Sequence, residues 1–119
     1  MQSYKDLIVW QKSFELVKVV YNLSKKFPKE ELYGLTSQIR RATVSIPSNI
    51  AEGYTRKSRQ EYTQFLRIAF GSGAELETQL LLAKDLKLAP TEEIYNVYNQ
   101  LQEVMKMLNK LISSLNPSG

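Results

Sequence analysis

LTSQIRRATVSIPSNIAEG, residues 35–53, carries apolar side chains at every third or fourth position: Leu35, Ile39, Ala42, Ile46 and Ile50. An α-helix turns once every 3.6 residues, so this spacing predicts a helix from about residue 35 to residue 52. Pro47 lies inside it and removes one backbone hydrogen bond. Because the apolar spacing continues past Pro47 without a change of phase, we expect a kink there rather than a break. Gly53 is placed to end the helix in the left-handed conformation that favours glycine.

The segments on either side show the same helical spacing. Residues 6–26 carry two apolar stripes, and residues 58–86 open with the capping box Ser58-Arg59-Gln60-Glu61. A further apolar stripe follows Ala89-Pro90 over residues 91–115. Four helices of roughly 18 to 29 residues with short connections predict an all-α fold. We expect residues 1–119 to form a single domain, an antiparallel up-down-up-down four-helix bundle with helix 2 kinked at a proline.

Histidine and cysteine are both absent from the sequence. Their absence excludes zinc sites built on imidazole or thiolate, Ser-His and Cys-His nucleophile pairs, and disulfides. Glu75 and Glu77 lie two residues apart, so on a helix they point away from each other and do not form a carboxylate pair. No phosphate-binding glycine motif is present. We therefore expect a protein that is not an enzyme, with no catalytic residue, no metal site and no cofactor.

The longest uninterrupted apolar runs, Leu7–Trp10 and Leu80–Ala83, are four residues each. A membrane span needs about 20. The first residues lack the basic region and apolar run of a secretory signal. We expect a cytoplasmic protein with no membrane partner.

Positive charge is concentrated between Gln38 and Arg67. This window holds six basic residues against the acids Glu52 and Glu61, an excess that equals the net charge of +4. All five arginines of the chain lie in it, and arginine presents a planar fork of donors that matches a phosphate. We expect a basic patch where the second and third helices meet. The candidate nucleic-acid-binding residues are Arg40, Arg41, Arg56, Lys57, Arg59 and Arg67.

Structural roles compete with phosphate contact at these positions. Arg40 and Arg41 flank the expected core, where phosphate contact and ion pairing with Glu52, Glu75 or Glu77 are both open. Arg56, Lys57 and Arg59 lie in and beside a turn, which favours a solvated or ligand-facing patch. Two aromatic residues stand among these basic residues and are of a type that stacks on bases. They are Tyr54 and Tyr62, of which Tyr62 has the helical spacing more typical of a core position.

Small residues interrupt the third helix at Gly71-Ser72-Gly73-Ala74. A glycine inside a helix costs about 1 kcal/mol relative to alanine, so we expect close approach of a neighbouring helix to offset this cost. The two apolar stripes of residues 6–26 make that helix wider in its apolar face than one packed neighbour requires. Together these features favour a helix–helix contact beyond the four of one chain, and we expect its partner to be another copy of the chain.

Several segments together resemble a known family. They are Asp6–Lys12, Phe27-Pro28, Tyr33–Ala42, Ser45–Gly53, Arg59, Phe65–Ala69, Gly71-Ser72 and Glu75–Leu80. In this order, over nearly the whole chain, they resemble the bacterial four-helix-bundle proteins encoded by intervening sequences within 23S ribosomal RNA genes. A related branch is the accessory variability determinant of diversity-generating retroelements, which assists a reverse transcriptase. The sequence departs from the family at Gly73, where a larger apolar residue or alanine is more usual.

The resemblance implies an antiparallel four-helix bundle assembled as a homopentameric barrel, with a basic surface directed to nucleic acid. Two classes of function follow. One is an RNA- or DNA-binding accessory protein that acts electrostatically through a ring of repeated basic patches. The other is a protein–protein interaction scaffold or accessory subunit with no nucleic-acid role, its arginines used in subunit contacts. The expected partners are therefore copies of the chain itself, as a homopentamer, and RNA or a nucleic-acid-associated protein.

Overall fold

Four long helices account for most of the chain, as the apolar spacing predicts. The computed structural model describes residues 3–116 and contains no β-strand among them. Short 3-10 helices at Tyr4–Asp6 and Lys29–Glu31 precede the first and second long helices. The predictions of an all-α fold and of four helices are confirmed. The long helices are α1 (Ile8–Ser24), α2 (Leu35–Tyr54), α3 (Arg59–Asp85) and α4 (Thr91–Leu115).

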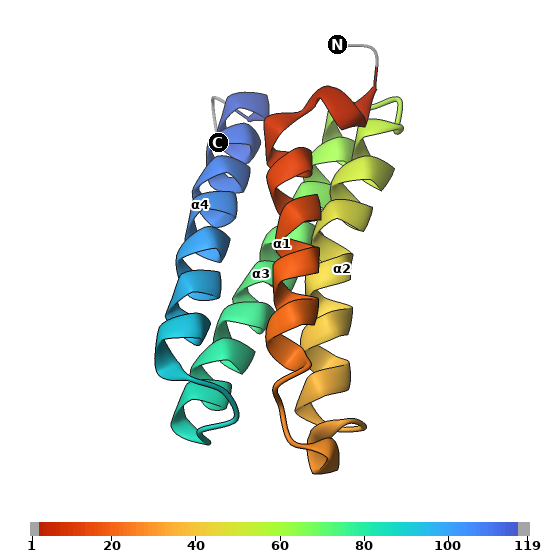
Figure 1. Ribbon diagram of the computed structural model, residues 1–119. Coiled ribbons are helices and arrows are strands. Elements are labelled where there is room, and N and C mark those ends of the chain that lie inside the picture. The colour runs from red at the N-terminus through yellow and green to blue at the C-terminus, as the bar shows by residue number, and fades with distance from the viewer. Residues whose placement is uncertain (1–2, 117–119) are drawn as a thin grey trace.

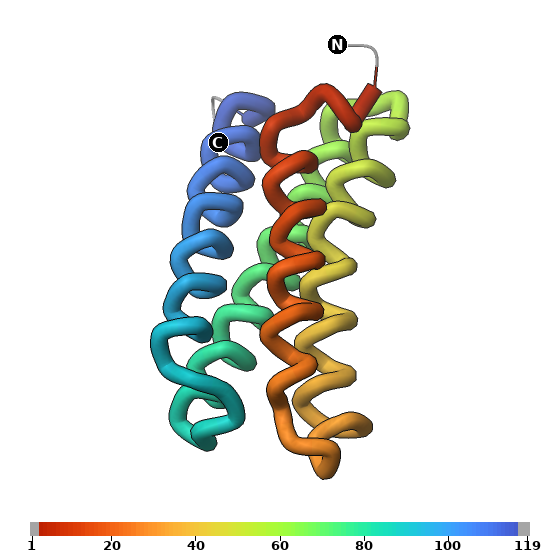
Figure 2. The backbone as a smooth tube through the Cα atoms, viewed as in Figure 1, coloured from red at the N-terminus to blue at the C-terminus, as the bar shows by residue number. Residues whose placement is uncertain are grey.

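The helices pack side by side into a rod of 44 × 22 × 20 Å (Figure 1). Each helix packs on the next one in the chain, and α4 closes the bundle against α1. The α1–α2 and α3–α4 connections lie at one end of the rod, and the α2–α3 turn lies at the other (Figure 2). Polar contacts follow the same arrangement, since Asn116 donates to the Thr63 hydroxyl at 3.1 Å and Tyr98 donates to Glu77 at 3.1 Å.

One stripe of each helix forms the core. In α2 the side chains of Ile39, Ala42, Ile46 and Ile50 are buried, as their spacing predicts. Burying a side chain of this size stabilises the fold by about 1.5–3 kcal/mol. The helix continues through the buried Pro47, and the kink expected there stays a prediction. The largest buried side chains on the other three helices are Leu16, Val20, Leu66, Leu76, Leu80, Ile94, Val97, Leu101 and Leu108.

Gly53 has a different role from the one its sequence context predicts. The expectation of a left-handed helix end is wrong, because α2 runs on to Tyr54 and no described glycine has a positive φ. A Cβ atom at Gly53 would lie 2.7 Å from the Cβ of Phe65 and 3.2 Å from the backbone oxygen of Tyr62. Glycine is therefore required here because α2 and α3 approach each other too closely for a side chain.

The two glycines inside α3 differ in their surroundings. A Cβ atom at Gly73 would overlap the sulfur of Met105 on α4, so the end of this side chain occupies the space beside Gly73. The close approach of a helix expected there stays a prediction. At Gly71 a Cβ atom would meet nothing within 4 Å, and the residue is exposed. Within residues 3–116, Gly73 therefore has the Met105 side chain beside it, whereas Gly71 has no such neighbour.

This contrast predicts opposite effects of one substitution at two helical glycines. Gly53→Ala is expected to lower the free energy of unfolding by about 1–3 kcal/mol, because the added methyl forces α2 and α3 apart. The matched change Gly71→Ala is expected to raise it by about 1 kcal/mol, because alanine is the better helix former and nothing opposes it. Urea unfolding followed by circular dichroism, at one protein concentration, measures both. Stabilisation by Gly53→Ala would contradict the close contact.

Candidate nucleic-acid interface

The six basic residues of the charged window form separate groups rather than one patch. Arg40 and Arg41 lie in the second turn of α2, whereas Arg56, Lys57 and Arg59 lie at and beyond its far end. At 1.5 Å per residue, the helix between Arg41 and its last residue is about 20 Å long. The structure therefore brings Arg56, Lys57 and Arg59 together at the α2–α3 turn and sets Arg40 and Arg41 near the α1–α2 connection.

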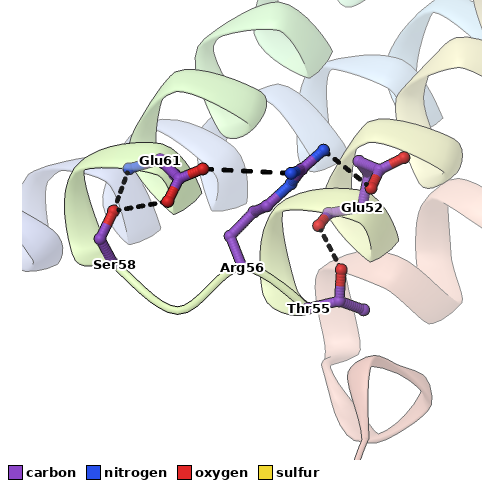
Figure 3. Close-up of polar contacts among 5 residues, drawn as sticks. All are labelled: Glu52, Thr55, Arg56, Ser58 and Glu61. Carbon is purple, nitrogen blue, oxygen red and sulfur yellow. Dashed lines mark hydrogen bonds and ion pairs between the residues drawn. The ribbon is translucent and has the colours of Figure 1, made fainter.

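Arg56 is bound to acidic side chains on both sides of the turn (Figure 3). It donates from Nη2 to the Glu52 carboxylate at 3.2 Å, and its Nη1 lies 4.0 Å from a carboxylate oxygen of Glu61. Its guanidinium also lies over the Phe65 ring, 4.8 Å from the centroid. The Ser58 hydroxyl accepts from the Glu61 backbone N–H at 3.1 Å, which confirms the predicted cap of α3. Most of the charge of Arg56 is therefore balanced locally.

Lys57, Arg59 and Arg67 are exposed, and none has a carboxylate within 4.0 Å in the part of the chain that the structure describes. We call Lys57 and Arg59 the turn surface. Arg67 lies five residues before Ser72, whose hydroxyl meets that of Ser45 on α2 at 2.7 Å. Five residues rotate a helix by about 140° beyond a full turn, so Arg67 lies on a side of α3 that faces away from α2.

Arg40 is held by neutral partners on α1. Its Nε donates to the hydroxyl of the buried Ser24 at 2.8 Å, and its guanidinium lies 4.9 Å from the centroid of the Tyr21 ring. The Ser24 hydroxyl in turn donates to the Tyr21 carbonyl at 2.9 Å. Among the described residues, the hydrogen bonds of Arg40 use Nε alone. Within residues 3–116, the two terminal nitrogens of its guanidinium therefore have no protein acceptor.

The alternative of an ion pair for Arg40 or Arg41 finds no support among residues 3–116. The three acids considered for it have other partners there. Glu52 pairs with Arg56, Glu75 accepts from Gln79 at 3.3 Å, and Glu77 accepts from the Tyr98 hydroxyl. The hydrogen bond to Glu77 raises the pKa of Tyr98 above its ordinary value.

Arg40 and Arg41 line an open hollow of about 520 Å³ beside the α1–α2 connection. The Tyr33 side chain, which also lines it, is 94% exposed. Sequence reasoning missed Tyr33, and the available signal was an aromatic residue two positions before the helix that carries the two arginines. We call this site the Arg40 hollow. Its lining residues are Tyr21, Leu32, Tyr33, Thr36, Ser37, Arg40, Arg41 and Val44.

The two aromatic residues named from the sequence are used in packing. The rings of Tyr54 and Tyr62 meet edge to face with centroids 6.0 Å apart, and both pack against the core. Burial raises the pKa of the Tyr62 hydroxyl. The core role considered for Tyr62 is therefore the one that its surroundings support.

We also searched the described part of the chain for a metal site and for a membrane-spanning helix. No group of three or more acidic side chains there is arranged to hold a metal ion. No helix in residues 3–116 is long and apolar enough to cross a membrane.

The fold and the site together define a small helical-bundle protein with separated basic surfaces. The model of the 23S rRNA-intervening sequence protein family matches residues 5–110, so the chain belongs to this family, as its sequence predicts. It is also similar to a solved structure described as a protein of unknown function from the S23 ribosomal protein family of Bacteroides thetaiotaomicron. The two are 28% identical with a TM-score of 0.83, over 88% of this chain and 98% of that chain. No curated protein sequence matches this chain.

The different surroundings of the two adjacent arginines predict different effects on stability. Arg40→Ala is expected to lower the free energy of unfolding by about 1 kcal/mol, because it removes the hydrogen bond to Ser24 and the contact with Tyr21. Arg41→Ala is expected to change it by less than about 0.5 kcal/mol, since Arg41 is exposed. Urea unfolding of the two variants measures the difference. Equal values would show that the anchoring of Arg40 contributes nothing.

Proposed function

We propose that this protein is a non-enzymatic RNA-binding accessory protein that acts as a cyclic homo-oligomer. The observation that carries the proposal is the lack of balancing acids in the charged window. Of its six basic residues, five have no carboxylate within 4.0 Å among residues 3–116, and Arg56 is the exception. Unbalanced cations bind phosphates by releasing counterions from the nucleic acid. Because the chain contains no base-reading module, we expect weak sequence specificity.

An exposed apolar face supports self-association. Phe14 is 44% exposed on α1, and Val44 is 39% exposed on the neighbouring α2. Between these helices lies a groove of about 310 Å³ with a mainly apolar lining. Exposed apolar surface of this kind marks protein–protein contacts. Five copies are the number that the family resemblance favours. The groove is lined by Tyr4, Trp10, Phe14, Val17, Lys18, Val44, Pro47, Ser48 and Ala51.

Assembly into a ring would raise the affinity of the protein for nucleic acid. The turn surface of one chain offers two cations, which alone give weak affinity. In a ring, identical surfaces repeat around one axis, so a strand that binds several of them gains affinity by avidity.

The second candidate function is an interaction scaffold with no nucleic-acid role. The local bonding of Arg56 to Glu52 and Glu61 favours it, because this arginine is already used in holding the α2–α3 turn.

Self-association is tested by sedimentation at micromolar concentration. The parent chain is expected to sediment as a species several times 13.7 kDa. Phe14→Glu combined with Val44→Glu is expected to give the monomer, because burying two carboxylates in an apolar contact is unfavourable. Asn96→Glu combined with Asn109→Glu adds the same charge at exposed positions of α4 and is expected to leave the assembly intact. A monomeric parent chain would refute the homo-oligomer.

RNA binding is tested by reversing the turn surface. Lys57→Glu combined with Arg59→Glu is expected to abolish retention on generic RNA at about 50 mM salt, because it replaces two phosphate contacts by repulsion. Arg56 is left unchanged, since a third glutamate beside Glu52 and Glu61 would disturb the turn. Fluorescence anisotropy measures binding, while helicity and sedimentation are expected to stay as in the parent.

The matched control is Lys106→Glu combined with Lys110→Glu on α4, where both lysines are exposed. This variant has the same net charge and is expected to keep RNA binding. If the turn variant binds as tightly as the parent, or the parent does not bind at this salt concentration, the scaffold function is favoured instead.

A further inference from the structure

We propose that the Arg40 hollow binds one unpaired nucleotide, with a backbone phosphate on the terminal nitrogens of Arg40 and the base stacked on Tyr33. The proposal rests on the proposed function and deepens it, because it names unpaired strands as the class of nucleic acid bound. The α1–α2 connection, beside which the hollow lies, and the α2–α3 turn are at opposite ends of the rod (Figure 1). It is therefore a site that can be tested separately.

The first support is the way Arg40 is held. Its Nε is bound to Ser24, and its guanidinium face lies over Tyr21. These contacts leave both terminal nitrogens for a ligand. An arginine that is already fixed loses less conformational freedom when it binds, so its contact with a phosphate is more favourable. No acidic side chain lines the hollow, and Arg41 adds a second positive charge to it.

The second support is the exposure of Tyr33. An aromatic side chain usually buries much of its surface, yet Tyr33 is 94% exposed and has no ring or hydrogen-bond partner through its side chain among the described residues. The turn that carries it is held in place, since the next residue, Gly34, donates to the Glu31 carbonyl at 2.9 Å. A tyrosine displayed in this way contributes little to the core. It provides a flat face on which a base of any sequence can stack.

The third support is the size and lining of the hollow. Its volume of about 520 Å³ lies within the range of roughly 300–1,000 Å³ that is usual for small-molecule sites. Leu32 and Val44 provide apolar surface, and the exposed Ser37 provides a hydroxyl. A base inside a duplex is covered by its neighbours on both faces, so it reaches a side chain only if it is unpaired or extruded. The hollow therefore favours unpaired strands.

The test compares a labelled single-stranded RNA of about 12 nucleotides, within the usual site sizes for such strands, with its perfect duplex. Tyr33→Leu is expected to weaken single-strand binding about tenfold, because leucine keeps the apolar bulk but offers no ring for stacking. The same variant is expected to bind the duplex as the parent does. Tyr33→Phe is expected to bind both as the parent does. Because Tyr33 is exposed, none of these changes disturbs the core.

A DNA strand of the same sequence shows whether the unpaired nucleotide comes from RNA or from DNA. A tenfold loss of affinity with Tyr33→Leu on either strand supports the site. If Tyr33→Leu binds single strands as the parent does while reversal of Lys57 and Arg59 weakens binding, the hollow is overturned and the proposed function stands. If the parent binds no nucleic acid, both are overturned.

Discussion

The close contact of α2 and α3 at Gly53 determines where the side chains of the candidate site lie. Without a side chain at Gly53, the two backbones meet next to a turn of only a few residues. Glu52 and Glu61 are thereby brought to the two sides of Arg56, which binds both. The same contact fixes the rotation of α2. Arg40 lies thirteen residues before Gly53, about 140° around the helix, and so it faces α1 and Ser24 rather than α3.

The sequence predicts the fold well because the signals for it are local. Apolar spacing identifies all four helices, and the cap at Ser58 is present where its motif lies. Gly53 shows the limit of this reasoning. A glycine near the end of a helix serves equally well to reverse the backbone or to admit a neighbouring helix, because both need the absence of a Cβ atom. Only the position of Phe65 on another helix separates the two roles.

The candidate site is less predictable, because nearness in sequence is not nearness in space. Residues 38–67 read as one basic window, yet a helix extends about 1.5 Å per residue and carries Arg41 some 20 Å from the turn surface. Arg67 lies eight residues beyond Arg59, which places it about 12 Å farther along α3 and about 80° around it. Tyr54 and Tyr62 resemble stacking residues in composition, but their rings pack on each other. The position of Tyr33 just before the helix that carries Arg40 and Arg41 is a weak signal in the sequence, because the exposure of its side chain becomes visible only in three dimensions.

The two basic sites make the two ends of the rod different from each other. The α2–α3 turn, which carries Lys57 and Arg59, lies at one end, and the α1–α2 connection, beside which the Arg40 hollow lies, is at the other (Figure 2). Cyclic symmetry rotates copies about a single axis and never inverts one, so every copy in a ring points the same way. The ring that we propose would therefore have two unlike faces. With the rods standing along the ring axis, a partner at one face would meet Lys57 and Arg59, and a partner at the other would meet Tyr33 beside Arg40. Such an assembly would distinguish the side from which it is approached.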